Sequence, residues 1–261
     1  MTPDRPLVRL LDHDPDLGAQ LSPERFAAAR AEVVARVVPL RPGPFDPEQL
    51  VRAQAAGYGL LILEGLVDRR ITVGGTAAMH LLGPGDLIAQ HWDEMHESTV
   101  HAEISWTVLE PAAIALLDVR FLAAVRPWPE IVGALFERVS KQAASLGIRS
   151  AILQLPRVED RVLAVLWYLA GRWGRVTTDG VLVPIALTHE MLGRLIGARR
   201  PTVSLALRRL EEAGRVRRGP RPRTWLLESD RAADAPASQP APAAPAEPVG
   251  RLDRAAAFAA R

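Results

Sequence analysis

Arginines are concentrated in one stretch of this sequence, in an amount that suits contact with a polyanion. Ten of them lie between Arg194 and Arg223, whereas Lys141 is the single lysine of the chain. Residues 156–228 carry 14 basic and 7 acidic side chains, and residues 1–155 carry 14 basic and 19 acidic ones. A guanidinium can donate paired hydrogen bonds to a phosphate or to the edge of guanine. Charge alone is equally compatible with a solvated basic face, so the elements that position the arginines decide the interpretation.

The segment Leu187–Leu227 has the residue pattern of a winged helix-turn-helix. Thr188 is a candidate N-cap for a short helix over residues 189–196, and Gly197 follows it as stop and turn. A second helix is predicted to begin at residue 199 or 200 and to end at Glu212, with a proline tolerated in its first turn. Two helices joined by a glycine-containing turn make a helix-turn-helix, whose second helix enters the major groove of DNA.

The second predicted helix has an apolar face and an outward face. At about 100° per residue, Val203, Leu207 and Leu210 share one sector and are expected to face the domain. Residues 215–227 then read as strand, basic hairpin and strand, which is the pattern of a wing. We expect the outward helix residues to meet base edges and phosphates, and the wing arginines to meet phosphates. The predicted DNA-contacting residues are Arg199, Arg200, Thr202, Ser204, Leu205, Arg208, Arg209, Arg217, Arg218, Arg221 and Arg223.

Residues 1–127, which precede the predicted helix-turn-helix, have a different pattern of apolar and turn-forming residues. Ser22-Pro23-Glu24 is predicted to start an amphipathic helix that runs to about Val38, so residues 1–40 are interpreted as a helical segment. Residues 41–127 contain short apolar runs separated by Gly74-Gly75, by Gly83-Pro84-Gly85-Asp86 and by Pro111. Short strands at this spacing predict a small antiparallel roll or sandwich.

A stripe of apolar residues at spacings of three and four predicts a long helix from Glu130 to Pro156. Such a stripe is compatible with a helix packed on its own domain and with a coiled-coil seam. Its position between two domains, one of which would need a two-fold partner, favours a dimerisation helix over residues 128–155. The predicted interface residues are Val132, Leu135, Val139, Ala143, Leu146 and Leu153.

The remaining segments complete the predicted organisation. A helix over residues 157–172 and short strands near Val176 and over 181–187 are assigned to the DNA-binding domain, residues 156–228. Residues 229–261 are rich in Ala and Pro and are predicted to be a disordered tail. The chain has no cysteine, which excludes disulfides and thiolate metal sites, and no apolar run long enough to span a bilayer. A cytoplasmic protein without a membrane segment is expected.

The sequence resembles the cyclic-AMP receptor protein (Crp–Fnr) superfamily over roughly residues 41–228. The motif "LTHEMLGRLIGARRPTVSLALRRLEEAGRV" is similar to the DNA-binding domain of that family. The runs "LLILEGLV" and "LLGPGDLI" fall where the family's β-roll carries its Leu-x-x-Gly and Pro-Gly-Asp signatures. The resemblance implies an α+β fold, with an N-terminal antiparallel β-roll like a cyclic-nucleotide-binding domain, a long dimerisation helix and a C-terminal winged helix-turn-helix.

The resemblance also implies a bacterial transcription regulator that acts as a homodimer on double-stranded DNA, with RNA polymerase as a further candidate partner. It places Thr188 and His189 against phosphate and makes Arg200 the main base-reading residue. Pro201 stands where relatives commonly have a glutamate, and Leu205 where many have an arginine, so a different operator sequence is expected.

The sensor part departs from cyclic-nucleotide binders. Those proteins follow Pro-Gly-Asp with a Gly-Glu pair and then with an arginine that holds the cyclic phosphate. Here Asp86 is followed by Leu87-Ile88-Ala89-Gln90, and no arginine occurs between Arg70 and Arg120. A buried phosphate needs a cation or a nest of amides, so we expect no cyclic-AMP site and predict no cofactor.

The sequence gives only weak indications of metal binding or of catalysis. His91, His96 and His101 lie among carboxylates and could hold a metal or haem, although a solvated acidic loop is the preferred interpretation. No nucleophile elbow, phosphate-binding loop or dinucleotide fingerprint occurs, so an enzyme is not expected. A ligand-independent DNA-binding regulator, and a signalling or enzymatic subunit that docks on nucleic acid, remain the alternatives.

Overall fold

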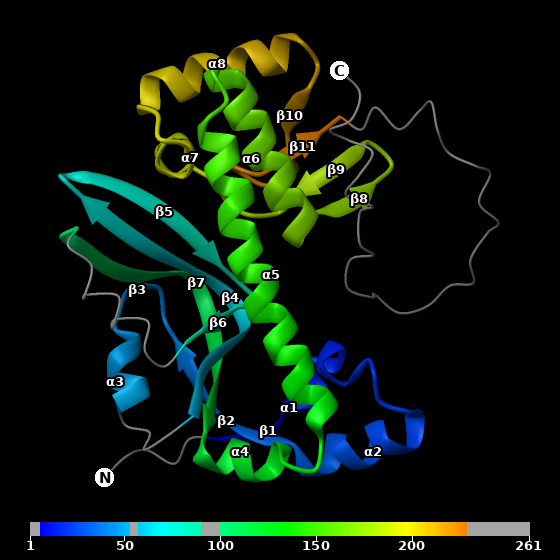
Figure 1. Ribbon diagram of the computed structural model, residues 1–261. Coiled ribbons are helices and arrows are strands. Elements are labelled where there is room, and N and C mark those ends of the chain that lie inside the picture. The colour runs from blue at the N-terminus through cyan, green and yellow to red at the C-terminus, as the bar shows by residue number, and fades with distance from the viewer. Residues whose placement is uncertain (1–5, 53–56, 90–99, 229–261) are drawn as a thin grey trace. The chain divides into compact units, whose positions relative to one another are not determined.

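The computed structural model describes residues 6–52, 57–89 and 100–228, and the chain divides into two compact units (Figure 1). The first, Met1–Gly147, is called here the roll unit, and the second, Ile148–Arg261, the helix-turn-helix unit. Helix α5, Pro129–Leu153, runs across the boundary between them. Among the described residues, no helix has both the length and the apolar character that crossing a membrane requires.

An antiparallel sheet forms the centre of the roll unit. Its strand order is β1-β2-β7-β4-β5, with β3 paired to β7 and β6 paired to β4. The strands are β1 Leu7–Arg9, β2 Val34–Leu40, β3 Gly43–Phe45, β4 Gly57–Val73, β5 Thr76–Leu82, β6 Leu87–Ile88 and β7 Ala102–Asp118. The helices are α1 Leu10–His13, the 3-10 helix η1 Pro15–Gly18, α2 Pro23–Glu32, α3 Pro47–Arg52 and α4 Val119–Val125, followed by α5.

The middle of this sheet is buried on both faces, as the alternation of side chains along the first half of β4 shows. Leu61 and Leu63 pack into one apolar cluster together with Phe121 of α4 and the start of α5. Leu60 and Ile62 point to the opposite face and pack into a second cluster. Side chains alternate across a strand, so the unbroken run Leu60–Leu63 supplies both cores, as expected for a strand covered on two sides.

The predicted helix from Ser22 to Val38 is only partly correct. Helix α2 starts as expected, with the Ser22 hydroxyl accepting from the Arg25 amide, but it ends at Glu32. Val34–Leu40 form strand β2, which pairs with β7. Residues 34–40 therefore belong to the sheet rather than to a helical segment, because valines are favoured on a pleated, half-buried surface beside a neighbouring strand.

The predicted short strands merge into two long ones. β4 and β7 have 17 residues each, and they pair along most of their length with register shifts around Gly65. Gly65 has a φ of 87°, and a Cβ there would lie 2.4 Å from the carbonyl oxygen of Pro111. The turn expected at Pro111 is thus a bulge inside a continuous ladder. The turn predicted at Gly74-Gly75 is confirmed as the β4–β5 hairpin.

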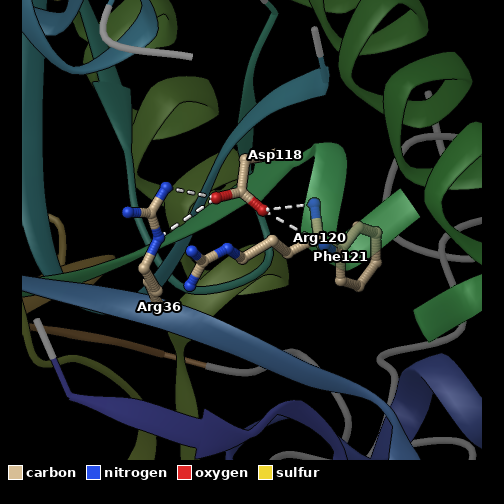
Figure 2. A network of polar contacts seen from close by, with 4 residues as sticks. All are labelled: Arg36, Asp118, Arg120 and Phe121. Atoms are coloured by element: carbon tan, nitrogen blue, oxygen red, sulfur yellow. Dashed lines mark hydrogen bonds and ion pairs between the residues drawn. The ribbon is translucent and has the colours of Figure 1, made fainter. Parts of the chain in front are cut away.

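A carboxylate network joins the end of β7 to helix α4 (Figure 2). Asp118 is the N-cap of α4, and its Oδ1 accepts from the amides of Arg120 at 3.0 Å and Phe121 at 3.1 Å. Its Oδ2 pairs with the guanidinium of Arg36 on β2. Burial alone would raise the pKa of Asp118, but the Phe121 amide, the Arg36 guanidinium and the Arg120 amide together hold this pKa below its ordinary value.

Replacing Asp118 with asparagine is expected to lower the free energy of unfolding by about 1–3 kcal/mol at neutral pH, because the amide keeps the cap but loses the charge opposite Arg36. The depressed pKa means that the carboxylate stabilises the fold above its unfolded pKa, and that this stability is lost as the pH falls through the folded pKa. Urea unfolding at several pH values should therefore show the difference shrinking below about pH 4. Asp16→Asn, at an exposed position of the same unit, is the control. A pH-independent difference would contradict this account.

In its described residues, the helix-turn-helix unit has three helices after the end of α5, together with a small antiparallel sheet of order β10-β11-β9-β8. Its elements are α6 Val158–Trp173, β8 Arg175–Thr177, β9 Gly180–Val183, α7 His189–Ile196, α8 Arg200–Glu212, β10 Val216–Arg218 and β11 Trp225–Leu227. One expectation needs adjustment. The predicted strand over 181–187 ends at Val183, before Pro184.

Candidate nucleic-acid interface

Helix α7 has the predicted N-cap residue at its start and the predicted glycine in the turn that leads to α8. The Thr188 hydroxyl accepts from the Met191 amide at 3.1 Å and caps α7. Gly197 ends α7 in the left-handed region with a φ of 66°. Gly193, which no sequence pattern singled out, is equally important, because a Cβ there would lie 2.4 Å from the carbonyl oxygen of Ala198. The turn after α7 can fold back this closely onto the helix because position 193 carries no side chain.

Helix α8 divides into a buried face and an outward face, as its sequence predicts. Val203, Leu207 and Leu210 are buried, together with Ala206. On the outward side, Leu205 keeps 49% of its surface exposed. Arg199, Arg200, Pro201, Thr202, Arg208 and Arg209 are also exposed, whereas Ser204 is half-buried.

Three of the predicted DNA-contacting arginines are held in ion pairs. Arg208 pairs with Glu212 one turn further along α8 at 2.9 Å. Arg218 pairs with Glu211 at 2.8 Å, and its guanidinium lies 4.3 Å from the ring centroid of the buried Trp225. Arg209 pairs with Glu159 on α6. Their side chains remain more than half exposed, so each pair is worth at most about 1 kcal/mol and can be exchanged for a phosphate.

A second group of arginines has no carboxylate to neutralise it. Arg199 and Arg200 at the start of α8, and Arg221 and Arg223 in the hairpin after β10, are exposed and make no ion pair within residues 6–52, 57–89 and 100–228. The sequence could not separate these four from the paired arginines, because pairing depends on where Glu159 and Glu211 come to lie. These four are the positive charges most available to a polyanion.

Thr224 holds the wing hairpin in shape. This side chain is 2% exposed, and its hydroxyl donates to the Arg221 carbonyl at 2.7 Å. Its backbone carbonyl accepts from the Gly219 amide at 2.9 Å. Arg223 has a φ of 65°, in the region that non-glycine residues seldom occupy. The predicted wing is therefore a tight hairpin that turns Arg217, Arg221 and Arg223 outward.

His189 is bound to α8 rather than left open at the surface. Its Nδ1 lies 2.7 Å from the Ser204 hydroxyl, which itself donates to the Arg200 carbonyl at 3.0 Å. Burial, followed by the nearby charges of Arg218 and Arg200, lowers the pKa of His189. The imidazole is therefore a neutral spacer between α7 and α8 at physiological pH, and any contact it makes with a phosphate would be that of a neutral donor.

The predicted interface on α5 requires a correction. Leu135 is 4% exposed and belongs to the apolar cluster of the roll, and Val132 packs against the same cluster. Phe136, which the sequence pattern did not select, is 73% exposed. Val139 and Leu146 are about half exposed, and Ala143 and Leu153 are also exposed. We call Phe136, Val139, Ala143, Leu146, Ser150 and Leu153, which follow spacings of three and four, the α5 seam.

Two of the three candidate metal-binding histidines lie outside the part of the chain that the structure describes. His101 is exposed, and His91 and His96 lie outside the described residues, as does the predicted tail 229–261. Within the described ranges, no three histidine or carboxylate side chains gather as a metal site would require. The Gly83–Asp86 turn is a structural feature, in which Asp86 Oδ2 accepts from the Gly83 amide at 2.8 Å.

Comparison with protein families identifies residues 160–232 as a Crp-like helix-turn-helix domain. No curated protein matches the chain. The match covers α6 from Asp160 onward and all elements through β11, which are the elements that position the arginines described above.

Several solved structures share the fold over most of the chain. A variant of CooA from Carboxydothermus hydrogenoformans has a TM-score of 0.56 at 18% identity, covering 82% of this chain and 91% of that one. A cyclic nucleotide-binding domain containing protein from Listeria monocytogenes has a TM-score of 0.57 at 15% identity, covering 82% and 97%. A CRP-family transcriptional regulator from Thermus thermophilus has a TM-score of 0.50 at 17% identity, covering 74% and 92%. At these identities, the similarity shows a shared fold.

Proposed function

The chain carries a Crp-like helix-turn-helix domain in a Crp-family regulator fold, and on this premise we propose that it is a transcription regulator that binds specific DNA sites as a homodimer. The observation that carries the proposal is the outward face of α8. This face begins with the exposed Arg200, which makes no ion pair among the described residues, and it includes the exposed Leu205, five residues later. A guanidinium at the first turn of a recognition helix reaches both acceptors of guanine.

The other exposed groups support contact with the DNA backbone. Arg199 precedes α8, and Arg221 and Arg223 lie in the wing. None of the three makes an ion pair in the part of the chain that the structure describes, so three positive charges flank the proposed base-reading face. Thr188 uses its hydroxyl oxygen as an acceptor in the cap, so its hydroxyl hydrogen is available to a phosphate. Phosphate contacts of this kind set the position of the helix and make binding dependent on salt.

The α5 seam supports the dimeric state. An apolar row that begins with a phenylalanine 73% exposed is unusual on the surface of a monomer, and its spacing suits packing against a second α5. A two-fold dimer would present two copies of α8 to half-sites about 34 Å apart, one turn of DNA.

The proposal is tested by selecting binding sites from random-sequence duplexes with the full chain and measuring their affinity by fluorescence anisotropy. We expect an inverted repeat whose half-sites are about one helical turn apart, bound by two chains and at least about a thousandfold more tightly than random DNA. A shuffled duplex of equal composition is the control. If no motif is enriched, or if the shuffled duplex binds equally well, the arginines form only a general polyanion surface.

A further inference from the structure

The outward face of α8 carries apolar side chains beside its arginines. Pro201, in the first turn, is exposed, and Leu205 keeps 49% of its surface exposed. Side chains four residues apart are neighbours on the surface of a helix, so these two form one surface, which we call the α8 apolar patch. The patch lies on the side of α8 opposite to Val203 and Leu207, which are buried in the domain.

The polar side chains next to the patch already have partners. Ser204 is half-buried, and its hydroxyl donates to the Arg200 carbonyl at 3.0 Å. Arg208, the next residue on the outward line, pairs with Glu212 at 2.9 Å. The middle of the proposed DNA-facing surface of α8 is therefore apolar, and its hydrogen-bonding groups lie at the margins.

An apolar surface can recognise one group on the base edges of the major groove. Those edges present hydrogen-bond donors and acceptors, and the C5 methyl group of thymine is their apolar group. Placed against another base, the side chain of Leu205 would displace water from polar groups without replacing the hydrogen bonds, which is unfavourable. The patch would therefore favour thymine and disfavour the other three bases at the same position.

The spacing along α8 indicates where this thymine would lie. Leu205 follows Arg200 by five residues, which is about 7.5 Å along a helix axis at about 1.5 Å per residue. Neighbouring base pairs are about 3.4 Å apart along the DNA axis. With α8 lying along the groove, Leu205 would therefore be about two base pairs from the guanine proposed for Arg200.

Resting on the proposed function, we infer that Leu205, backed by Pro201, is a specificity-determining residue that reads the C5 methyl group of one thymine in each half-site. The contact is apolar and complements the hydrogen bonds from Arg200. Its contribution can be isolated, because deoxyuridine lacks the methyl group of thymine and keeps the same hydrogen-bonding groups.

The probes are selected duplexes in which each thymine of the half-site is replaced in turn by deoxyuridine, symmetrically in both half-sites. Fluorescence anisotropy measures the affinity of the full chain. At one thymine, about two base pairs from the guanine whose preference relaxes in Arg200→Ala, the replacement should weaken binding by about tenfold. Losing one buried methyl group corresponds to about fourfold, and a dimer makes the contact twice. At the other thymines the change should be about twofold or less.

Variants at position 205 assign the methyl contact to this side chain. Leu205→Asn has a similar size but a polar end, so it should bind the thymine and deoxyuridine duplexes equally well. Leu205→Met remains apolar and should keep most of the difference between them. Arg199→Ala is the matched control, because losing a phosphate contact should weaken both duplexes and leave their ratio unchanged.

The inference is overturned if no thymine of the selected half-site is sensitive to deoxyuridine. It is also overturned if the sensitivity persists in Leu205→Asn, since DNA shape or another residue would then be responsible. If Leu205→Asn does not fold, judged by circular dichroism, the shorter Leu205→Ala decides by the same ratio. A selected motif without methyl sensitivity leaves the proposed function intact, whereas failure to select any motif contradicts the proposed function and this inference together.

Discussion

Replacing Arg200 with alanine is expected to weaken binding to the selected DNA site by about tenfold or more, while binding to random duplexes changes by no more than about threefold. The reason is that a bidentate contact from arginine to guanine discriminates against the wrong base by about 1–3 kcal/mol. A dimer makes this contact twice, once in each half-site. Arg200 is exposed at the first turn of α8 and has no carboxylate partner among the described residues. Anisotropy titrations on selected and random DNA, with each base pair of the half-site changed in turn, should show relaxed preference at one position.

Arg221→Ala is the matched control for Arg200→Ala. Arg221 is also exposed and unpaired among the described residues, but it lies in the wing hairpin, where phosphate contact is proposed. Its removal should weaken selected and random DNA to a similar extent and reduce the slope of log K against log salt by about one for each phosphate that is no longer bound. If Arg200→Ala weakened both kinds of DNA equally, α8 would not be the element that reads bases.

The double variant Phe136→Glu with Leu146→Glu is expected to be monomeric. In a symmetric α5 pair, these changes would bring carboxylates into an apolar seam, where buried charges without partners are strongly unfavourable. Both positions are exposed in the single chain, at 73% and 47%, so the roll should fold normally. Light scattering coupled to size exclusion measures the mass, and affinity for the inverted repeat should fall because two half-sites are no longer bound together.

Ala144→Glu with Ala151→Glu provides a control of equal charge at exposed positions of α5 outside the seam, and it should remain dimeric. A dimeric Phe136/Leu146 variant would rule out the α5 seam as the interface. Leu135→Glu would be misleading as a test, because Leu135 is part of the roll core and its replacement is expected to destabilise the unit.

The helix-turn-helix could be predicted almost residue by residue because its signals are local. The cap at Thr188, the left-handed Gly197 and the buried spacing of Val203, Leu207 and Leu210 each depend on neighbours within one or two turns. The fold class followed from the same kind of pattern, together with a motif long enough to resemble one family. For these elements, the tertiary structure added one requirement, the close approach at Gly193.

In the roll unit, contacts between segments far apart in sequence determine which residues form strands and which side chains are buried. Val34–Leu40 form a strand because β7 lies beside them, more than 70 residues later in the chain. Leu135 and Phe136 point about 100° apart on one helix, and only the position of the roll core determines which of them is buried.

The difference between local and long-range determinants also applies to the charged side chains. The sequence by itself determined that arginines crowd the helix-turn-helix unit and that three of them lie on its second helix, α8. Only the tertiary structure decided that Glu159 pairs with Arg209 and Glu211 with Arg218, while Arg200 has no ion pair among the described residues. Periodicity and capping are short-range effects that one stretch of sequence encodes, whereas the partner of a charge and the side of a buried residue depend on the packing of the whole chain.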